Sequence, residues 1–137
     1  MGWRIVKIIA DTNILVRAIA DDDEVQSPLA RAQLDGARLV ALTLPTLCEL
    51  AWVLIKGFKV SRQEFADMLR TLIAADNVEV DHAAVEAGLA FLDAGGDFAD
   101  GVITHEGQWL GGETFVSFDV QAVKIAKRRG RAAVTPV

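Results

Sequence analysis

Short apolar runs alternate with longer segments of helical periodicity along the chain. The first run, residues 3–10, carries isoleucine and valine on both faces, which predicts a central strand that is covered on both sides. Further short strands are predicted at 38–42, 78–80 and 114–118, with a last edge strand at 132–134.

Helices are predicted between these strands, at 12–20, 24–36, 45–56, from Ser61 onward, and at 81–94, 97–106 and 120–129. Ser61 and Glu64 have the spacing of a capping box, and Gly95-Gly96 separates two of the helices. Such alternation is typical of βαβ units. The sequence therefore predicts an α/β fold, one domain over residues 1–137 with a mostly parallel central β-sheet of about four to five strands flanked by helices.

Composition narrows the class of protein. A chain of 137 residues is long enough for a single domain with a hydrophobic core. The single cysteine, Cys48, excludes a disulfide framework and a CxxC zinc site. The sequence has no signal-peptide pattern and no run of about 18 apolar residues. We therefore expect a cytoplasmic protein that does not associate with membranes.

The sum of the charges argues against a phosphate-rich partner. The 14 basic and 19 acidic residues give 14 − 19 = −5, whereas nucleic-acid-binding domains are usually basic. The distribution of the charges weakens that argument. Residues 21–24 form an acidic block, which a solvated loop explains, and the last segment is crowded with cations: Lys124, Lys127, Arg128, Arg129 and Arg131.

Two aspartates share one local pattern. Asp11 in IIADTNIL and Asp119 in FVSFDVQAV each follow a predicted strand and precede a predicted helix. This pattern places each carboxylate beyond the carboxyl end of a strand, where open parallel sheets bind ligands. Aspartate is also a preferred N-cap residue, so a structural and a functional interpretation remain open for both.

Glu49 is the only ionisable residue of segment 44–55, LPTLCELAWVLI. The segment is apolar on every side of a helical wheel, which predicts a largely buried helix. Buried glutamates are rare unless they are paired or bind a cation. The alternatives are a solvent-filled gap or a distant arginine partner.

Asp97 and Asp100 in GGDFADGVI occupy the positions of an N-cap and of an acid in the first helical turn. If Asp100 shares a cleft with Asp11, Glu49 and Asp119, each pair at about 4 Å repels by roughly 4 kcal/mol at an effective dielectric constant of 20. A divalent cation that prefers oxygen ligands, Mg²⁺ or Mn²⁺, relieves this repulsion and engages phosphate oxygens. The sequence therefore predicts a metal site for phosphate chemistry.

The motifs DTN, LCELAWVL, DFADGVI and SFD resemble, in order and spacing, those of the PIN-domain ribonucleases. The resemblance is closest to the VapC-like toxins of type II toxin–antitoxin systems, and it extends from about residue 5 to residue 129. It implies a Mg²⁺- or Mn²⁺-dependent endoribonuclease that cuts RNA with a metal-activated water. It also implies a homodimer that a VapB-like antitoxin neutralises.

The resemblance assigns roles to individual residues. Asp11, Glu49 and Asp100 would bind the catalytic metal directly, and Asp119 would bind a second ion or act through water. The supporting residues would be Thr12, Asn13, Asp97 and Ser117. We further predict RNA contacts from the cationic side chains of Arg17, Lys124, Lys127 and Arg128. Gly101 stands where alanine is common in the family, which lowers helix propensity.

Two other functions remain open from the sequence. A PIN-like module that binds nucleic acid or protein without cutting would show no metal-dependent turnover. A metal-dependent phosphatase on a related α/β fold would use Asp11 as a covalent nucleophile. Asn13 stands where that chemistry normally has a second aspartate, which disfavours the phosphatase.

Overall fold

The computed structural model describes residues 6–137, so the start of the strand predicted at 3–10 lies outside the described residues. Contacts divide the chain into two compact units. The N-terminal unit ends at Val80, and the C-terminal unit spans Asp81–Val137. The prediction of one domain over the whole chain stays a prediction.

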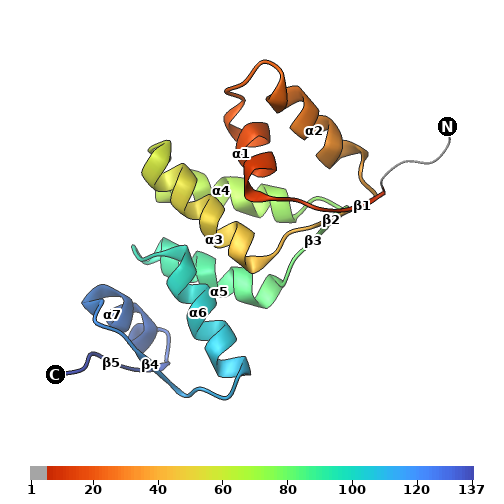
Figure 1. Ribbon diagram of the computed structural model, residues 1–137. Helices are drawn as coiled ribbons and strands as arrows, with labels where there is room; N and C mark the ends of the chain where they lie inside the picture. The colour runs from red at the N-terminus through yellow and green to blue at the C-terminus, as the bar shows by residue number, and fades with distance from the viewer. Residues whose placement is uncertain (1–5) are drawn as a thin grey trace. The chain divides into compact units, whose positions relative to one another are not determined.

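The N-terminal unit is built on a parallel sheet with the strand order β1-β2-β3. Its register pairs Ile8 with Val40 and Val40 with Val78. Helices connect the strands (Figure 1). A π-helical segment, η1, continues one of these helices. The elements are β1 (Lys7–Ile9), α1 (Thr12–Ala20), α2 (Gln26–Gly36), β2 (Leu39–Ala41), α3 (Leu44–Trp52), η1 (Val53–Gly57), α4 (Arg62–Ile73) and β3 (Val78–Glu79).

The helices of this unit turn leucine and phenylalanine side chains inward. Leu15 of α1, Leu47 and Leu50 of α3, and Phe65 of α4 are fully buried. Burial of one such side chain contributes roughly 1.5–3 kcal/mol. Because α1 and α3 pack against each other, this core fixes the start of α1 relative to the middle of α3.

The C-terminal unit contains a helical pair and a second, smaller parallel sheet of β4 and β5. Phe91, Ile125 and Ala126 form a buried cluster, and Phe115 and Ala133 of the two strands pack against it. Figure 1 shows α5 and α6 side by side and α7 beside the strands. The elements are α5 (His82–Asp93), α6 (Phe98–Trp109), β4 (Thr114–Val116), α7 (Val120–Arg128) and β5 (Ala132–Val134).

The elements expected from periodicity are confirmed within the described residues, with shifts of a few residues at their ends. The capping box is confirmed as well. The amide of Glu64 donates to Ser61 Oγ at 3.0 Å, and the amide of Ser61 donates to Glu64 Oε1 at 3.0 Å. The α/β class with parallel sheets is therefore confirmed.

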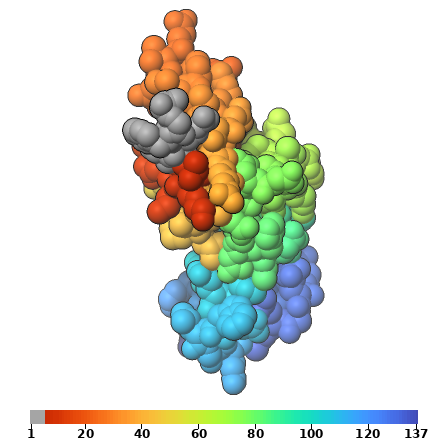
Figure 2. All heavy atoms as spheres, turned by 90° about the vertical axis from the view of Figure 1, so that its right-hand side faces the viewer, coloured from red at the N-terminus to blue at the C-terminus, as the bar shows by residue number. Residues whose placement is uncertain are grey.

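The sheet differs in one respect from the single central sheet that the pattern predicts. The described strands form two sheets, because β1 bonds to β2 whereas β4 bonds to β5. One side of β1 consequently lies at the surface of the N-terminal unit, where Figure 2 shows it in red and where Ile9 is 79% exposed. No helix among the described residues has the length and apolar character that crossing a membrane requires.

Two glycines bring the backbones of α5 and α6 into close contact. A Cβ added at Gly101 would lie 2.2 Å from the carbonyl oxygen of Ala87 and 2.7 Å from the Cα of Gly88. A Cβ at Gly88 would in turn lie 2.6 Å from the ring of Phe98. The sequence suggested only a loss of helix propensity at Gly101. The structure shows that the close packing of the first turns of α6 requires this glycine.

We predict that Gly101→Ala destabilises the protein by about 1–3 kcal/mol, because the added methyl group meets backbone atoms that cannot move aside cheaply. Alanine is the better helix former, so this steric cost acts against a gain of up to about 1 kcal/mol. The matched control is Gly107→Ala in the same helix, where a Cβ meets nothing within 4 Å. Measured by urea unfolding, the change in the free energy of unfolding relative to the wild type should have opposite signs in the two variants. Equal stability of both variants would contradict the steric explanation.

Candidate metal centre

Three aspartates of the C-terminal unit come together at two helix N-termini. Asp97 occupies the N-cap position of α6, Asp100 lies in the first turn of that helix, and Asp119 is the N-cap of α7. One carboxylate oxygen of each lies within 4.8 Å of one from each of the others. Asp97 and Asp119 are exposed, and Asp100 is half-buried.

Hydrogen bonding leaves most of these carboxylate oxygens available. Asp119 Oδ1 accepts from the amide of Ala122 at 3.0 Å, and the amide of Asp119 donates to Ser117 Oγ at 3.0 Å. Asp97 occupies the predicted N-cap position of α6, but its side chain makes no capping hydrogen bond.

The cluster is electrostatically strained. Burial raises the pKa of Asp100 above its ordinary value, and the negative charges of Asp97 and Asp119 raise it further. Carboxylate oxygens at this spacing are the ligands that Mg²⁺ and Mn²⁺ prefer. A hard divalent cation would cancel the repulsion, so the donor set fits such an ion.

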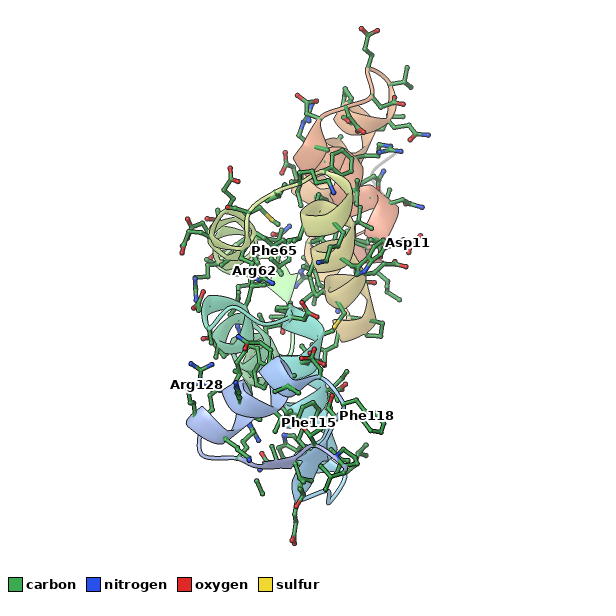
Figure 3. The ribbon with its side chains drawn as sticks, turned by 90° about the vertical axis from the view of Figure 1, so that its left-hand side faces the viewer. Asp11, Arg62, Phe65, Phe115, Phe118 and Arg128 are labelled. Carbon is green, nitrogen blue, oxygen red and sulfur yellow. The ribbon has the colours of Figure 1, made fainter. Side chains whose placement is uncertain are left out.

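The N-terminal unit contributes a second group of predicted site residues. Asp11 is the N-cap of α1 and accepts from the amide of Thr12 at 2.9 Å. The buried Thr12 hydroxyl donates to Glu49 Oε1, which ties α1 to α3. Asp11, Thr12 and Glu49 line a cavity of about 280 Å³ together with Asn13 and Arg17. Figure 3 shows Asp11 at the surface of its unit.

The prediction that Glu49 lies in a largely buried helix is wrong. In α3 the side chains of Leu47, Leu50 and Ala51 are buried, whereas Glu49 is exposed and Trp52 is 66% exposed. Only one face of α3 is covered by the rest of its unit, so the other side stays exposed although its sequence is apolar. A carboxylate that faces water avoids the desolvation cost of burial.

The acidic block at 21–24 has structural partners that a solvated loop would lack. Arg17 Nη1 donates to both carboxylate oxygens of Asp22 at 3.2 Å, and its Nε donates to Gln26 Oε1 at 3.1 Å. Asp23 Oδ1 accepts from two backbone amides at the start of α2, which lowers the pKa of Asp23. The charge of Arg17 is therefore partly neutralised within its own unit.

The remaining predicted contacts, Lys124, Lys127 and Arg128, are exposed on α7. Sequence reasoning treated Asp97 as a supporting residue, but the structure makes it an equal member of the acidic cluster. The spacing of Asp97 and Asp100 was the available signal, because residues three apart lie on one face at the start of a helix.

Comparison with known proteins adds one finding. The family model described as PIN domain matches residues 8–130, which is nearly the whole chain and includes parts of both units. No curated protein matches the sequence.

We predict that Asp100→Asn raises the melting temperature of the metal-free protein at neutral pH. A raised pKa means that the folded state binds the proton more tightly than the unfolded state, so stability falls as pH rises through the raised pKa. The variant removes that loss. The difference in melting temperature between Asp100→Asn and the wild type should therefore vanish at pH values below the ordinary aspartate pKa. Calorimetry in EDTA at a series of pH values measures this difference.

The control for this comparison is Glu86→Gln, which removes one charge from an exposed site on α5 of the same unit. Added Mg²⁺ should raise the melting temperature of the wild type and of Glu86→Gln more than that of Asp100→Asn. An Asp100→Asn protein no more stable than Glu86→Gln in EDTA would mean that the carboxylates do not repel significantly.

Proposed function

The chain belongs to the PIN-domain family, whose members are generally metal-dependent nucleases, and from this premise we propose that it is a Mg²⁺- or Mn²⁺-dependent endoribonuclease. The observation that carries this proposal is the convergence of Asp97, Asp100 and Asp119. Asp119 caps α7, but capping does not require two further carboxylates beside it, and the three together suit a hard divalent ion. The resemblance of the motifs to those of ribonucleases favours RNA as the substrate.

The metal ligands that we propose from the family resemblance are Asp11, Glu49, Asp100 and Asp119. Support for Asp11 and Glu49 comes from the family resemblance and from the cavity that both line. When bound, the ion would supply an activated water and neutralise charge on the phosphodiester. Asp97 would add negative charge and keep the ion at the cluster.

The chain's own residues would orient these ligands. The Thr12 hydroxyl holds one oxygen of Glu49, and Asn13 lines the same cavity. The Ser117 hydroxyl holds the backbone at Asp119. Among the proposed RNA contacts, Arg17 shares its charge with Asp22 and Gln26, so we expect it to contribute less than Lys124, Lys127 and Arg128.

We further propose that the enzyme acts as a VapC-like toxin, forms a homodimer and is neutralised by a VapB-like antitoxin. The order and spacing of DTN, LCELAWVL, DFADGVI and SFD support this part of the proposal.

Purified protein should cut single-stranded RNA into discrete products with Mg²⁺ or Mn²⁺ and not with EDTA. Asp11→Asn and Asp100→Asn should each reduce the cleavage rate by about a hundredfold or more, because each removes a charged group at the reacting phosphate. Glu86→Gln is the matched charge control and should cut normally. Circular dichroism confirms that the variants are folded, and sequencing of the products identifies the cleavage site.

The same proteins test the toxin proposal. Induction of the wild type in a bacterial host should arrest growth, whereas Asp100→Asn should not, and light scattering should give the mass of a dimer. A wild type that binds Mg²⁺ by calorimetry and binds RNA without cutting it would favour a binding module. Trapping of an aspartyl phosphate at Asp11 would favour a phosphatase.

We also predict that Thr12→Val weakens the apparent Mg²⁺ affinity in the cleavage assay by roughly tenfold, because a group that orients a metal ligand typically contributes 10- to 100-fold. Thr12→Val keeps the shape of the buried side chain but removes the hydrogen bond to Glu49. Thr12→Ser keeps the hydroxyl and should restore most of the affinity. If cleavage by Thr12→Val and by the wild type depended equally on the Mg²⁺ concentration, Glu49 would not be a ligand of the metal.

A further inference from the structure

The outer face of α7 borders an open cavity of about 520 Å³ in the C-terminal unit. Three cations line this α7 cavity together with one amide side chain and the residue that ends α5: Lys124, Lys127, Arg128, Gln121 and Ala94. Figure 3 shows Arg128 pointing outward from the helix. The cavity therefore offers several hydrogen-bond donors and three positive charges in one concave place.

Helix geometry gathers these cations on one side. Lys124, Lys127 and Arg128 have the spacing of i, i+3 and i+4, which puts them on one helix face. The opposite face is buried in the unit through Ala122, Val123, Ile125 and Ala126. Attraction to the negative end of the helix explains cations in the last turn, where Lys127 and Arg128 lie. It does not explain Lys124, which lies one turn earlier.

The three charges lack internal compensation. Among the residues that the structure describes, none of the three forms an ion pair. Like charges on one helix face repel one another, and this grouping occurs in a chain whose net charge is −5. An anion bound in the α7 cavity would relieve that repulsion, as a cation would relieve it at the acidic cluster.

The α7 cavity adjoins the acidic cluster. Ala94 precedes Asp97 by three residues and Gln121 follows Asp119 by two, so their Cα atoms are at most about 11 Å and 7 Å apart, respectively. The loop between α5 and α6 also contacts α7 next to the α7 cavity. A Cβ at Gly95 would lie 3.7 Å from Gln121 Nε2. Along α7, a rise of about 1.5 Å per residue puts Lys124 about 8 Å and Arg128 about 14 Å beyond Asp119. A strand of RNA with one phosphate at the acids can therefore bring a phosphate one or two nucleotides away to the cations.

We propose that the α7 cavity binds an uncut backbone phosphate of the RNA strand, close to the phosphate that is hydrolysed at the aspartates. This inference rests on the proposed nuclease function. Lysine, arginine and glutamine bind phosphate oxygens without reading bases. The contact is the same in the ground state and the transition state, so it strengthens substrate binding without accelerating the chemical step.

The deciding experiment measures the affinity of a fluorescently labelled single-stranded RNA by anisotropy in EDTA, where no cleavage occurs, between about 50 and 200 mM salt. Lys124→Gln and Arg128→Gln should each weaken binding several-fold for RNAs of different sequence. Each should also reduce the slope of log affinity against log salt by about 0.7–1. Arg129→Gln is the matched control, since it removes the same charge from the next residue, outside the α7 cavity.

Equal effects of Arg128→Gln and Arg129→Gln would overturn the inference, because general charge attraction would then explain the binding. Absence of RNA binding by the wild type would overturn the inference too. It would also be overturned if inorganic phosphate bound at the α7 cavity while Lys124→Gln left the affinity for RNA unchanged. A nuclear magnetic resonance titration with inorganic phosphate identifies that last case from the amide signals of Gln121 and Lys124.

Cleavage in Mg²⁺ separates this inference from the proposed function. In a working nuclease, Lys124→Gln and Arg128→Gln should raise KM several-fold and leave kcat near the wild-type value. Metal-dependent cleavage with an unchanged KM in both variants would remove the phosphate site and keep the nuclease. RNA binding that depends on the α7 cavity, without cleavage under any metal, would keep the phosphate site and remove the nuclease.

Discussion

Repulsion among Asp97, Asp100 and Asp119 is the interaction on which the chemistry of the C-terminal unit depends. Their carboxylate oxygens lie within 4.8 Å of one another. Each pair at such a distance repels by roughly 1 kcal/mol in water and about 4 kcal/mol at an effective dielectric constant of 20. The dipole at a helix N-terminus stabilises each nearby acidic side chain by only about 0.3–1 kcal/mol. The two helix N-termini therefore do not balance three acids in a partly buried place, whereas a divalent cation does.

Backbone packing holds this unfavourable cluster together. Glycine in a helix costs about 1 kcal/mol relative to alanine, and Gly88 and Gly101 lie at the contact between α5 and α6. Without a Cβ at either position, the two helices approach closely enough for Phe98 to be buried beside Gly88. That contact fixes the first turn of α6, and with it the positions of Asp97 and Asp100.

The sequence predicted elements and caps well because both depend on neighbouring residues. The helix that starts at Thr12 and the capping box of Ser61 and Glu64 are examples. Strand partners depend on distant residues, and strands of two or three residues carry little information about them. Glu49 illustrates another limit. A helical wheel shows that a segment is apolar, but the packing of the folded unit decides which of its faces is covered.

The candidate site was only partly predictable, for a reason that α7 makes clear. Capping and dipole preferences alone place an acid such as Asp119 at the start of a helix and cations at its end. The structural and the functional interpretation therefore agree on residue types and differ only in the surroundings. At the start of α7 Asp119 meets two further acids, which capping does not require. In the middle of α7, Lys124 lines the α7 cavity, where attraction to the helix dipole does not explain a cation. These departures from the preferences of an isolated helix are the physical evidence that α7 has a role in binding as well as in folding.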